Sequence, residues 1–155
     1  MNIVIANRQR TKKINSRRLK QIIQALFSEL AIDEAELGIQ LVGAREMARV
    51  NWQYLQHEGS TDVITFDYGE NNEDAHVLTS PVKLHGELFV CVDEAITQAN
   101  EFHTTWQDEV VRYVVHGVLH LLGYDDLKPD LRRTMKREEN RLMQKLGKQF
   151  SFLEL

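Results

Sequence analysis

The sequence is poor in the residues that build disulfide frameworks, long linkers and membrane spans. It has one cysteine, Cys91, which excludes an internal disulfide and suits a reducing compartment such as the cytoplasm. Two prolines and eight glycines leave little room for extended linkers. No apolar run approaches the roughly 20 residues that a membrane-spanning helix requires. The start of the chain lacks the long apolar stretch of a signal peptide, so we expect none.

The rest of the composition is that of an ordinary globular domain. Of the 155 residues, 43% are hydrophobic and 27% are charged. These fractions exclude a disordered, collagen-like or low-complexity chain. A chain of this length buries enough surface to form a core without covalent staples. We therefore expect residues 1–155 to form one domain.

The net charge of −4 conceals an uneven distribution. Residues 8–20 and 132–148, near the two ends of the chain, each hold seven Lys or Arg. Residues 57–82, between them, contain six acids and no Lys or Arg. The basic segments are either the solvated faces of two helices or a positive surface that attracts the phosphate backbone of a nucleic acid.

Hydrophobic periodicity predicts an α+β domain in which about five helices cover a small, mixed, four-stranded sheet. The predicted strands are residues 2–6, 37–42, 62–68 and 87–92, and a polar loop is expected at 69–82. The predicted helices are residues 16–30, 44–56, 93–102, 106–122 and a last helix that begins near 130. Ser16 and Asp130 are the expected N-caps of the first and last helices.

The segment 106–122 carries the most informative pattern. Valine and leucine occupy nearly every side of this predicted helix, so it belongs in the core. Within it, His116 and His120 are four residues apart, so both imidazoles leave one face of the helix about one turn apart. Such a pair either binds one metal ion, as in the H-E-x-x-H helices of zinc enzymes, or consists of two satisfied core histidines.

A third candidate ligand follows the pair. Gly123 ends the helix and lets the chain turn back, and Asp125 and Asp126 come soon after. A carboxylate is an ordinary zinc ligand, and we assign that role to Asp126, although both aspartates also suit plain turn or capping duty. Three protein ligands leave a fourth coordination position for water, which is the pattern of catalytic zinc sites.

The same residues resemble the signature of a known family. The stretch from His116 to Asp126 reads HGVLHLLGYDD, and the signature of the YbeY family, the endoribonucleases of ribosomal RNA maturation, reads H-G-x-L-H-L-x-G-Y-D-H. Asn51, Tyr54 and the sequence TDVITF at 61–66 resemble the family's L-N-x-x-Y-R and T-D-V-L-S-F blocks. The sequence GELFV at 86–90 resembles its G-D-I-x-I strand.

The resemblance implies a function and its partners. It implies a cytoplasmic, metal-dependent endoribonuclease directed at single-stranded RNA in ribosomal RNA maturation and ribosome quality control. It also implies one divalent ion on the signature helix, with zinc as the expected metal. The expected partners are ribosomal RNA and the small ribosomal subunit, and no membrane is expected.

Two positions depart from the family pattern. Asp126 stands where the family has a third histidine, and a carboxylate there lowers the charge of the site by one unit and favours harder metals such as Mn²⁺. Leu55 stands where the family usually has an arginine that is expected to hold RNA phosphate or the transition state. Arg49, His57 or a basic terminal segment would have to compensate, or the activity would be weak.

Two further carboxylates are candidates for catalytic duty. Glu109 shares a helix face with His116, so we expect it to orient that imidazole, unless it is a surface carboxylate. Asp62 belongs to the TDVITF block, which the family keeps close to the metal helix, and its alternative role is that of an ordinary strand-entry carboxylate.

Two rival functions remain open. Asp126 and Leu55 favour a non-catalytic RNA- or ribosome-binding factor that retains the fold. The histidine spacing also resembles that of metallopeptidases, but Gly117 occupies the position where those enzymes carry a catalytic glutamate.

Overall fold

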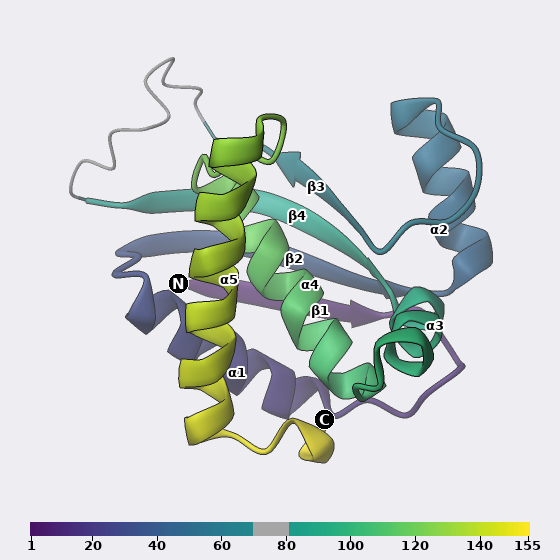
Figure 1. Cartoon of the computed structure of the whole chain (residues 1–155), viewed down its shortest axis with the longest axis horizontal. Helices are drawn as coiled ribbons and strands as arrows, with labels where there is room; N and C mark the ends of the chain where they lie inside the picture. The colour runs from purple at the N-terminus through teal and green to yellow at the C-terminus, as the bar shows by residue number, and fades with distance from the viewer. Residues whose placement is uncertain (70–80) are drawn as a thin grey trace.

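The computed structural model of the chain describes residues 1–69 and 81–155 (Figure 1). The polar loop expected at 69–82 therefore lies almost entirely outside the described residues. The rest of the chain forms one α+β domain with a single open sheet.

The sheet has four strands in the order β1-β2-β4-β3. The strands are β1 (Asn2–Asn7), β2 (Glu34–Val42), β3 (Val63–Asp67) and β4 (Lys83–Cys91). β1 and β4 both pair with β2 in parallel, and β3 pairs with β4 in antiparallel, which confirms the predicted mixed sheet. β2 and β4 begin earlier than predicted, because Ala35 and Leu84 extend the inward-facing row between polar, outward-facing neighbours.

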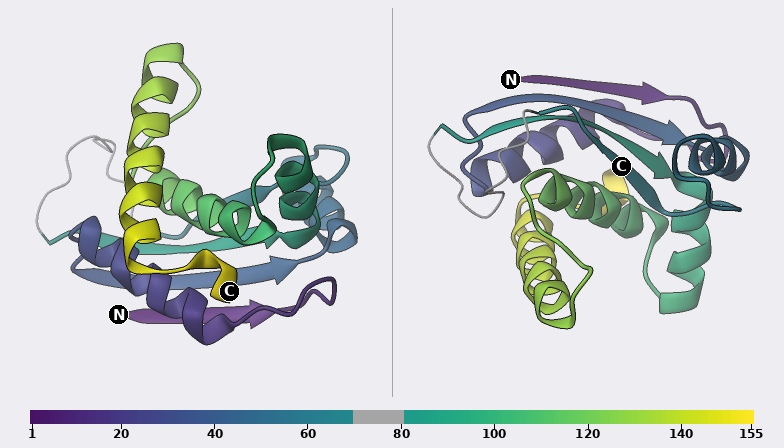
Figure 2. Two further views of the ribbon diagram at one scale, coloured as in Figure 1. Left: turned by 60° about the horizontal axis from the view of Figure 1, so that its bottom comes forward. Right: turned by 90° about the horizontal axis from the view of Figure 1, so that it is seen from above.

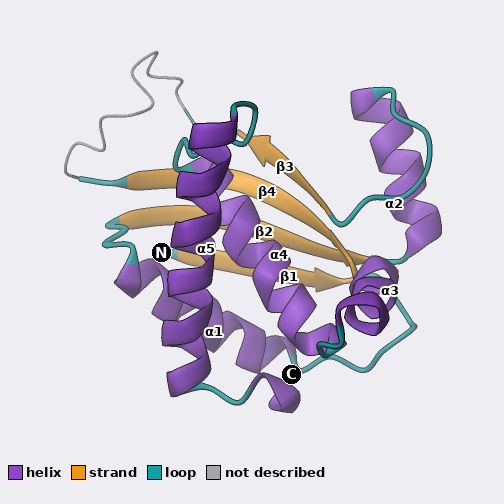
Figure 3. Ribbon diagram, in the orientation of Figure 1, coloured by secondary structure: helices purple, strands orange, loops and turns teal. Residues whose placement is uncertain are grey.

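The helices lie mainly on one face of the sheet (Figures 2 and 3). They are α1 (Ser16–Glu29), α2 (Ala44–Val50), α3 (Val92–Phe102), α4 (Trp106–Leu121) and α5 (Pro129–Gln149). Figure 2 shows α1, α4 and α5 on the same side of the sheet, and their apolar side chains form the main core with those of β1, β2 and β4. None of the helices in the described part of the chain combines the length and the apolar character needed to cross a membrane.

Two helix starts differ from the prediction. Asn15, not Ser16, caps α1, because its side-chain oxygen accepts a hydrogen bond from the Arg18 backbone N–H at 3.0 Å. α5 begins at Pro129, whose fixed φ suits the first helical position. Asp130 therefore lies in the first turn of α5 and does not cap it.

The helix predicted at 44–56 changes geometry partway along. α2 ends at Val50, and Asn51–Leu55 continue as a π-helix that ends at Gln56 with a φ of 55°. Asn51 is buried, and its side-chain amide donates a hydrogen bond to the Gly59 carbonyl oxygen at 2.9 Å. This bond ties the π-helix to the connection that leads into β3.

A glycine allows α4 to lie close to the sheet. A Cβ atom at Gly117 would lie 2.7 Å from the side chain of Leu88 on β4, so a larger residue would push the helix away. α4 is consequently buried along most of its length, and its His116 and His120 side chains remain only partly covered.

Candidate metal centre

The carboxyl-terminal half of α4 presents two imidazoles on one side. The His116 and His120 side chains are 30% and 28% exposed, whereas Glu109 and Tyr113, closer to the start of the helix, are buried. The Nε2 atoms of the two histidines lie 3.1 Å apart. This contact follows from their spacing of one helical turn.

The turn after α4 brings a carboxylate to the two histidines. Gly123 adopts a φ of 99°, and its N–H donates to the His120 carbonyl oxygen at 3.0 Å, which closes the end of the helix. Asp126 Oδ2 then lies 3.6 Å from His120 Nε2 and 4.0 Å from His116 Nε2. One ligand atom from each of the three residues lies within 4.8 Å of the others. The structure thus brings together the three residues that the sequence proposed as metal ligands.

The second nitrogen of each imidazole is held by a protein acceptor. His120 Nδ1 lies 3.1 Å from the Tyr124 carbonyl oxygen, and His116 Nδ1 lies 2.9 Å from Glu139 Oε1 on α5. A carbonyl oxygen and a carboxylate can only accept, so each Nδ1 donates. In the neutral rings, both Nε2 atoms therefore carry lone pairs.

Glu139 is a buried carboxylate at the centre of a charge network. It is 3% exposed, and its Oε2 accepts hydrogen bonds from Arg112 Nη1 at 2.8 Å and from Lys136 Nζ at 2.9 Å. Burial raises the pKa of Glu139, but the hydrogen bonds from His116, Lys136 and Arg112 outweigh it and lower the pKa to about 2. Glu139 is therefore an ionised acceptor for the His116 ring at neutral pH.

This arrangement fits a divalent cation. Two lone pairs that face each other at 3.1 Å, with a carboxylate beside them, repel unless positive charge lies between them. Two nitrogens in tetrahedral coordination at the zinc–nitrogen distance lie roughly 3.3 Å apart, close to the observed separation. The Nδ1 contacts to Glu139 and Tyr124 are of the kind that orient metal-binding imidazoles.

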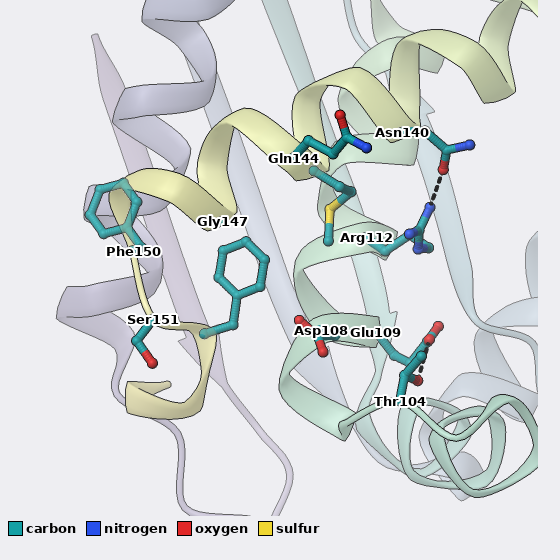
Figure 4. A pocket seen from close by; sticks show the side chains of 11 residues that line it. Thr104, Asp108, Glu109, Arg112, Asn140, Gln144, Gly147, Phe150 and Ser151 are labelled. Carbon is teal, nitrogen blue, oxygen red and sulfur yellow. Dashed lines mark hydrogen bonds between the residues drawn. The ribbon is translucent and has the colours of Figure 1, made fainter.

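Glu109 does not contact His116, which corrects the expectation from the sequence. It is 5% exposed, and its Oε1 accepts a hydrogen bond from Thr104 Oγ1 at 2.7 Å. Figure 4 shows this pair at a pocket between the start of α4, α5 and the end of the chain. The seven residues from Glu109 to His116 span about 10 Å of helix, too far for a direct hydrogen bond.

Sequence reasoning missed Glu139, although a signal was present. The buried residues of α5 recur at helical spacing, and they are Met135, Glu139, Leu142, Met143 and Leu146. A glutamate in the middle of such an apolar stripe needs a buried partner, because an unpaired buried carboxylate destabilises the folded protein. The pattern indicates a buried charged contact, but it does not name the partner.

Asp62 lies at the same site as the clustered residues. It lines a groove together with His116, His120 and Asp126, and β3 forms one side of this groove. Its Oδ1 accepts a hydrogen bond from the Val63 backbone N–H at 2.7 Å. Asp62 thus has the alternative role considered from the sequence, that of a strand-entry carboxylate, and it is also a neighbour of the candidate metal centre.

Leu55 also lines this groove, at the end of the π-helix. It is 45% exposed, so the position at which the resemblance led us to expect an arginine faces the groove. Among the residues that the structure describes, no Lys or Arg lines the groove. Arg132 is close by, because its Nε donates a hydrogen bond to the Asp126 carbonyl oxygen at 3.2 Å, and further positive charge for an RNA backbone has to come from other parts of the molecule.

Several charges of the two basic segments are paired. Arg18 on α1 lies 2.8 Å from Glu154, and Lys145 on α5 lies 3.4 Å from Glu29. These contacts link α1 to the end of the chain and to α5. Part of the positive charge on these two helices therefore belongs to ordinary ion-paired surfaces.

Comparison with known proteins finds one family along nearly the whole chain. A sequence model of this family, endoribonuclease YbeY, matches residues 4–147. An endoribonuclease YbeY from Chlorobium phaeovibrioides is 32% identical over 147 residues, which cover 95% of this chain and 92% of the relative. One from Parabacteroides distasonis is 42% identical over 98 residues, 63% of this chain and 62% of the relative.

A solved structure has the same fold. The solution structure of a Thermotoga maritima protein matches with a TM-score of 0.64 at 23% identity, over 95% of this chain and 90% of that protein. At this identity, the likeness supports the arrangement of helices and strands.

Proposed function

Because this chain belongs to the endoribonuclease YbeY family, we propose that it is a metal-dependent endoribonuclease that cleaves single-stranded RNA in ribosomal RNA maturation and ribosome quality control. The observation that carries the proposal is the convergence of His116, His120 and Asp126 beside an open groove. A ribosomal RNA substrate favours the cytoplasm as the location and the small ribosomal subunit as the partner.

Zinc is the proposed metal. Two imidazoles and one carboxylate are ligands that zinc accepts, and three protein ligands are typical of its catalytic sites. Asp126 in place of a third imidazole makes the site harder, so Mn²⁺ is the nearest competitor. A divalent ion bound by these residues supplies Lewis-acid stabilisation of the charge that develops on the cleaved phosphate.

Asp62 is the proposed general base. It lines the groove but is not one of the three clustered ligand residues. A carboxylate within reach of the substrate can accept the proton of the attacking hydroxyl group, whether this belongs to water or to the ribose. Glu139 has a different task, because it holds the proton on His116 Nδ1 and so keeps Nε2 available as a ligand atom.

A non-catalytic RNA-binding role is the second candidate. Leu55 favours it, because this apolar side chain lines the groove where an arginine would contact phosphate. The metallopeptidase-like alternative lacks such support, since Gly117 faces Leu88 and carries no carboxylate.

Metal analysis combined with RNA cleavage tests the proposal. The wild-type protein is expected to hold one zinc per chain and to cleave a labelled single-stranded RNA in preference to a duplex. His120→Ala is expected to lose both properties. His85→Ala is the matched control, because it removes an exposed imidazole on β4 that lies outside the cluster.

The same assay separates the alternatives. RNA binding without cleavage in the presence of zinc or Mn²⁺ would favour the non-catalytic factor. Digestion of casein would favour the peptidase. Wild-type protein without bound metal, and with the same properties as His120→Ala, would refute the metal site.

A further inference from the structure

Four arginines surround a concave surface away from the candidate metal centre. Arg8 and Arg10 come from the connection between β1 and α1, and Arg45 and Arg49 come from α2. All four are exposed. We refer to these four residues as the arginine cradle.

The charge of the cradle is only partly compensated. Glu46 is the acidic residue among its described lining. Arg8 contacts Glu46 through Nη2 at 2.7 Å and through Nε at 3.2 Å, and Arg49 Nη2 lies 3.2 Å from the same carboxylate. Arg10 and Arg45 make no ion pair or side-chain hydrogen bond within residues 1–69 and 81–155. Four arginines against Glu46 and the adjoining Asp93, whose carboxylate accepts from neutral donors, leave an excess of two positive charges, which favours a polyanionic ligand.

A buried glutamine fixes the backbone that carries Arg8 and Arg10. Gln9 is 7% exposed, and its side-chain amide donates to Asn7 Oδ1 at 2.9 Å and to the Lys12 carbonyl oxygen at 2.6 Å. Its side-chain oxygen accepts from the Lys12 backbone N–H at 2.9 Å. With all these bonds made, Gln9 holds this connection in one conformation.

Asp93 joins the two halves of the cradle. Its Oδ1 accepts a hydrogen bond from Thr11 Oγ1 at 2.8 Å, and its Oδ2 accepts one from the Ala44 backbone N–H at 2.6 Å. Thr11 follows Arg10 and Ala44 precedes Arg45, so one carboxylate sets the distance between the two arginine-bearing segments. A site that is held in this way loses less conformational entropy when a ligand binds.

The cradle and the groove are joined by one helical segment. Arg45 and Arg49 are four residues apart on α2, so they share one helix face, and Trp52 follows in the π-helix that continues α2. Trp52 is 58% exposed and offers a surface on which a base can stack. The π-helix then ends at Leu55, which lines the groove. The distance along the helix from Ala44 to Leu55 is about 16 Å, and Figure 1 shows α2 standing clear of the helices that cover the sheet.

We propose that the arginine cradle binds the phosphate backbone of the RNA strand whose cleavage site lies in the metal groove. This inference rests on the proposed endoribonuclease function. The groove lacks Lys and Arg among its described lining residues, and the cradle supplies the missing positive charge. The cradle therefore adds affinity for the RNA backbone, and the groove selects the bond to be cleaved. Arginine suits this role because its planar guanidinium group can form two hydrogen bonds with one phosphate.

Salt-dependent RNA binding tests the proposal. The ligand is a fluorescent single-stranded RNA of about 12 nucleotides, within the site sizes of single-strand binders, and EDTA prevents cleavage. The double variant Arg10→Gln/Arg45→Gln removes the two arginines that make no ion pair or side-chain hydrogen bond among the described residues. Arg17→Gln/Lys20→Gln is the matched control, because it removes two exposed positive charges from α1. Thermal unfolding checks that all proteins are folded.

The cradle variant is expected to bind the RNA about tenfold more weakly at 0.1 M salt. The negative slope of log K against log salt should become shallower by about 1.4, which is about 0.7 for each of the two lost phosphate contacts. The control is expected to change affinity less than twofold. Equal affinities and slopes for the two variants would overturn the proposal and leave an acidic protein as the alternative occupant.

Cleavage by the wild-type protein is measured separately. If wild type cleaves RNA but the two variants bind equally, the cradle is refuted and the endoribonuclease stands. If wild type does not cleave but the cradle variant alone loses affinity, the cradle stands and the enzyme is refuted. A wild-type protein that binds no RNA overturns both.

Discussion

Two buried carboxylates lie at different points along α4, and they have different surroundings. Glu109, near the start of the helix, accepts one hydrogen bond from the neutral Thr104 hydroxyl group. Glu139, which α5 places beside the middle of α4, accepts hydrogen bonds from Arg112, Lys136 and His116. The two side chains are almost equally buried, so burial alone does not mark a functional carboxylate. The difference lies in the positive partners and in the imidazole that one of them orients.

The largest difference between the two ends is expected on removal of a ligand. His116→Ala should weaken zinc binding by more than 100-fold, because loss of an outer hydrogen-bond partner alone costs about 10–100-fold. Tyr113→Phe, one turn closer to the start of α4, removes a buried hydroxyl group that has no partner among the described residues and should leave zinc affinity unchanged. Titration calorimetry measures both. Similar affinities for the two variants would contradict the assignment of the ligand end.

A second difference concerns acid stability. The pKa of Glu139 is lowered from 4.5 to about 2, so the folded protein binds this proton more weakly than the unfolded chain. The resulting stabilisation is present above about pH 4.5 and is lost as the pH falls toward 2. It amounts to about 3 kcal/mol.

Urea unfolding of the metal-free protein between pH 6 and pH 2 checks this expectation. The free energy of unfolding of the wild type should fall toward that of Glu139→Gln as the pH decreases. A constant gap between the two proteins would show that Glu139 is not held ionised by its partners.

The third prediction compares the two carboxylates directly. Glu139→Gln should weaken zinc binding by about 10–100-fold, because the His116 ring loses its charged acceptor. Glu109→Gln should change zinc affinity by less than about twofold, since none of the three proposed ligands contacts Glu109 in the described structure. Circular dichroism before each titration confirms that the variants are folded. A larger loss for Glu109→Gln would reverse the comparison.

The smallest effect is expected at Thr104. Thr104→Val removes the donor to Glu109 and leaves a buried carboxylate oxygen without this hydrogen bond. The free energy of unfolding should fall by about 1–2 kcal/mol, with no change in zinc affinity. Thermal unfolding and calorimetry separate the two quantities. A drop in zinc affinity would show that the two ends of α4 are coupled.

The sequence predicts the parts of the site that are local in the chain. His116 and His120 are fixed by helical spacing, and Gly123 turns the chain so that Asp126 reaches them within a few residues. The mixed sheet and its helices could also be predicted from the sequence, because apolar periodicity is a local property of the chain.

The parts that were missed depend on tertiary contacts. Glu139 lies 23 residues beyond His116 on another helix, and no spacing rule connects them. The arginine cradle likewise depends on Asp93, which joins its two segments and lies 82 residues beyond Thr11 of the first segment. Helix packing and side-chain hydrogen bonds decide such pairs, and a single sequence does not specify them.

The π-helix at Asn51–Leu55 brings Leu55 to the groove within a helix that holds one extra residue. A π-turn accommodates one residue more than an α-turn, so it behaves as an insertion absorbed within a helix. Removal of one residue before Leu55 would restore α-geometry and leave Leu55 on nearly the same side of the helix. The direction of this side chain is thus tolerant of a one-residue change in chain length. Replacing Leu55 by arginine, in contrast, changes the chemistry of the groove directly.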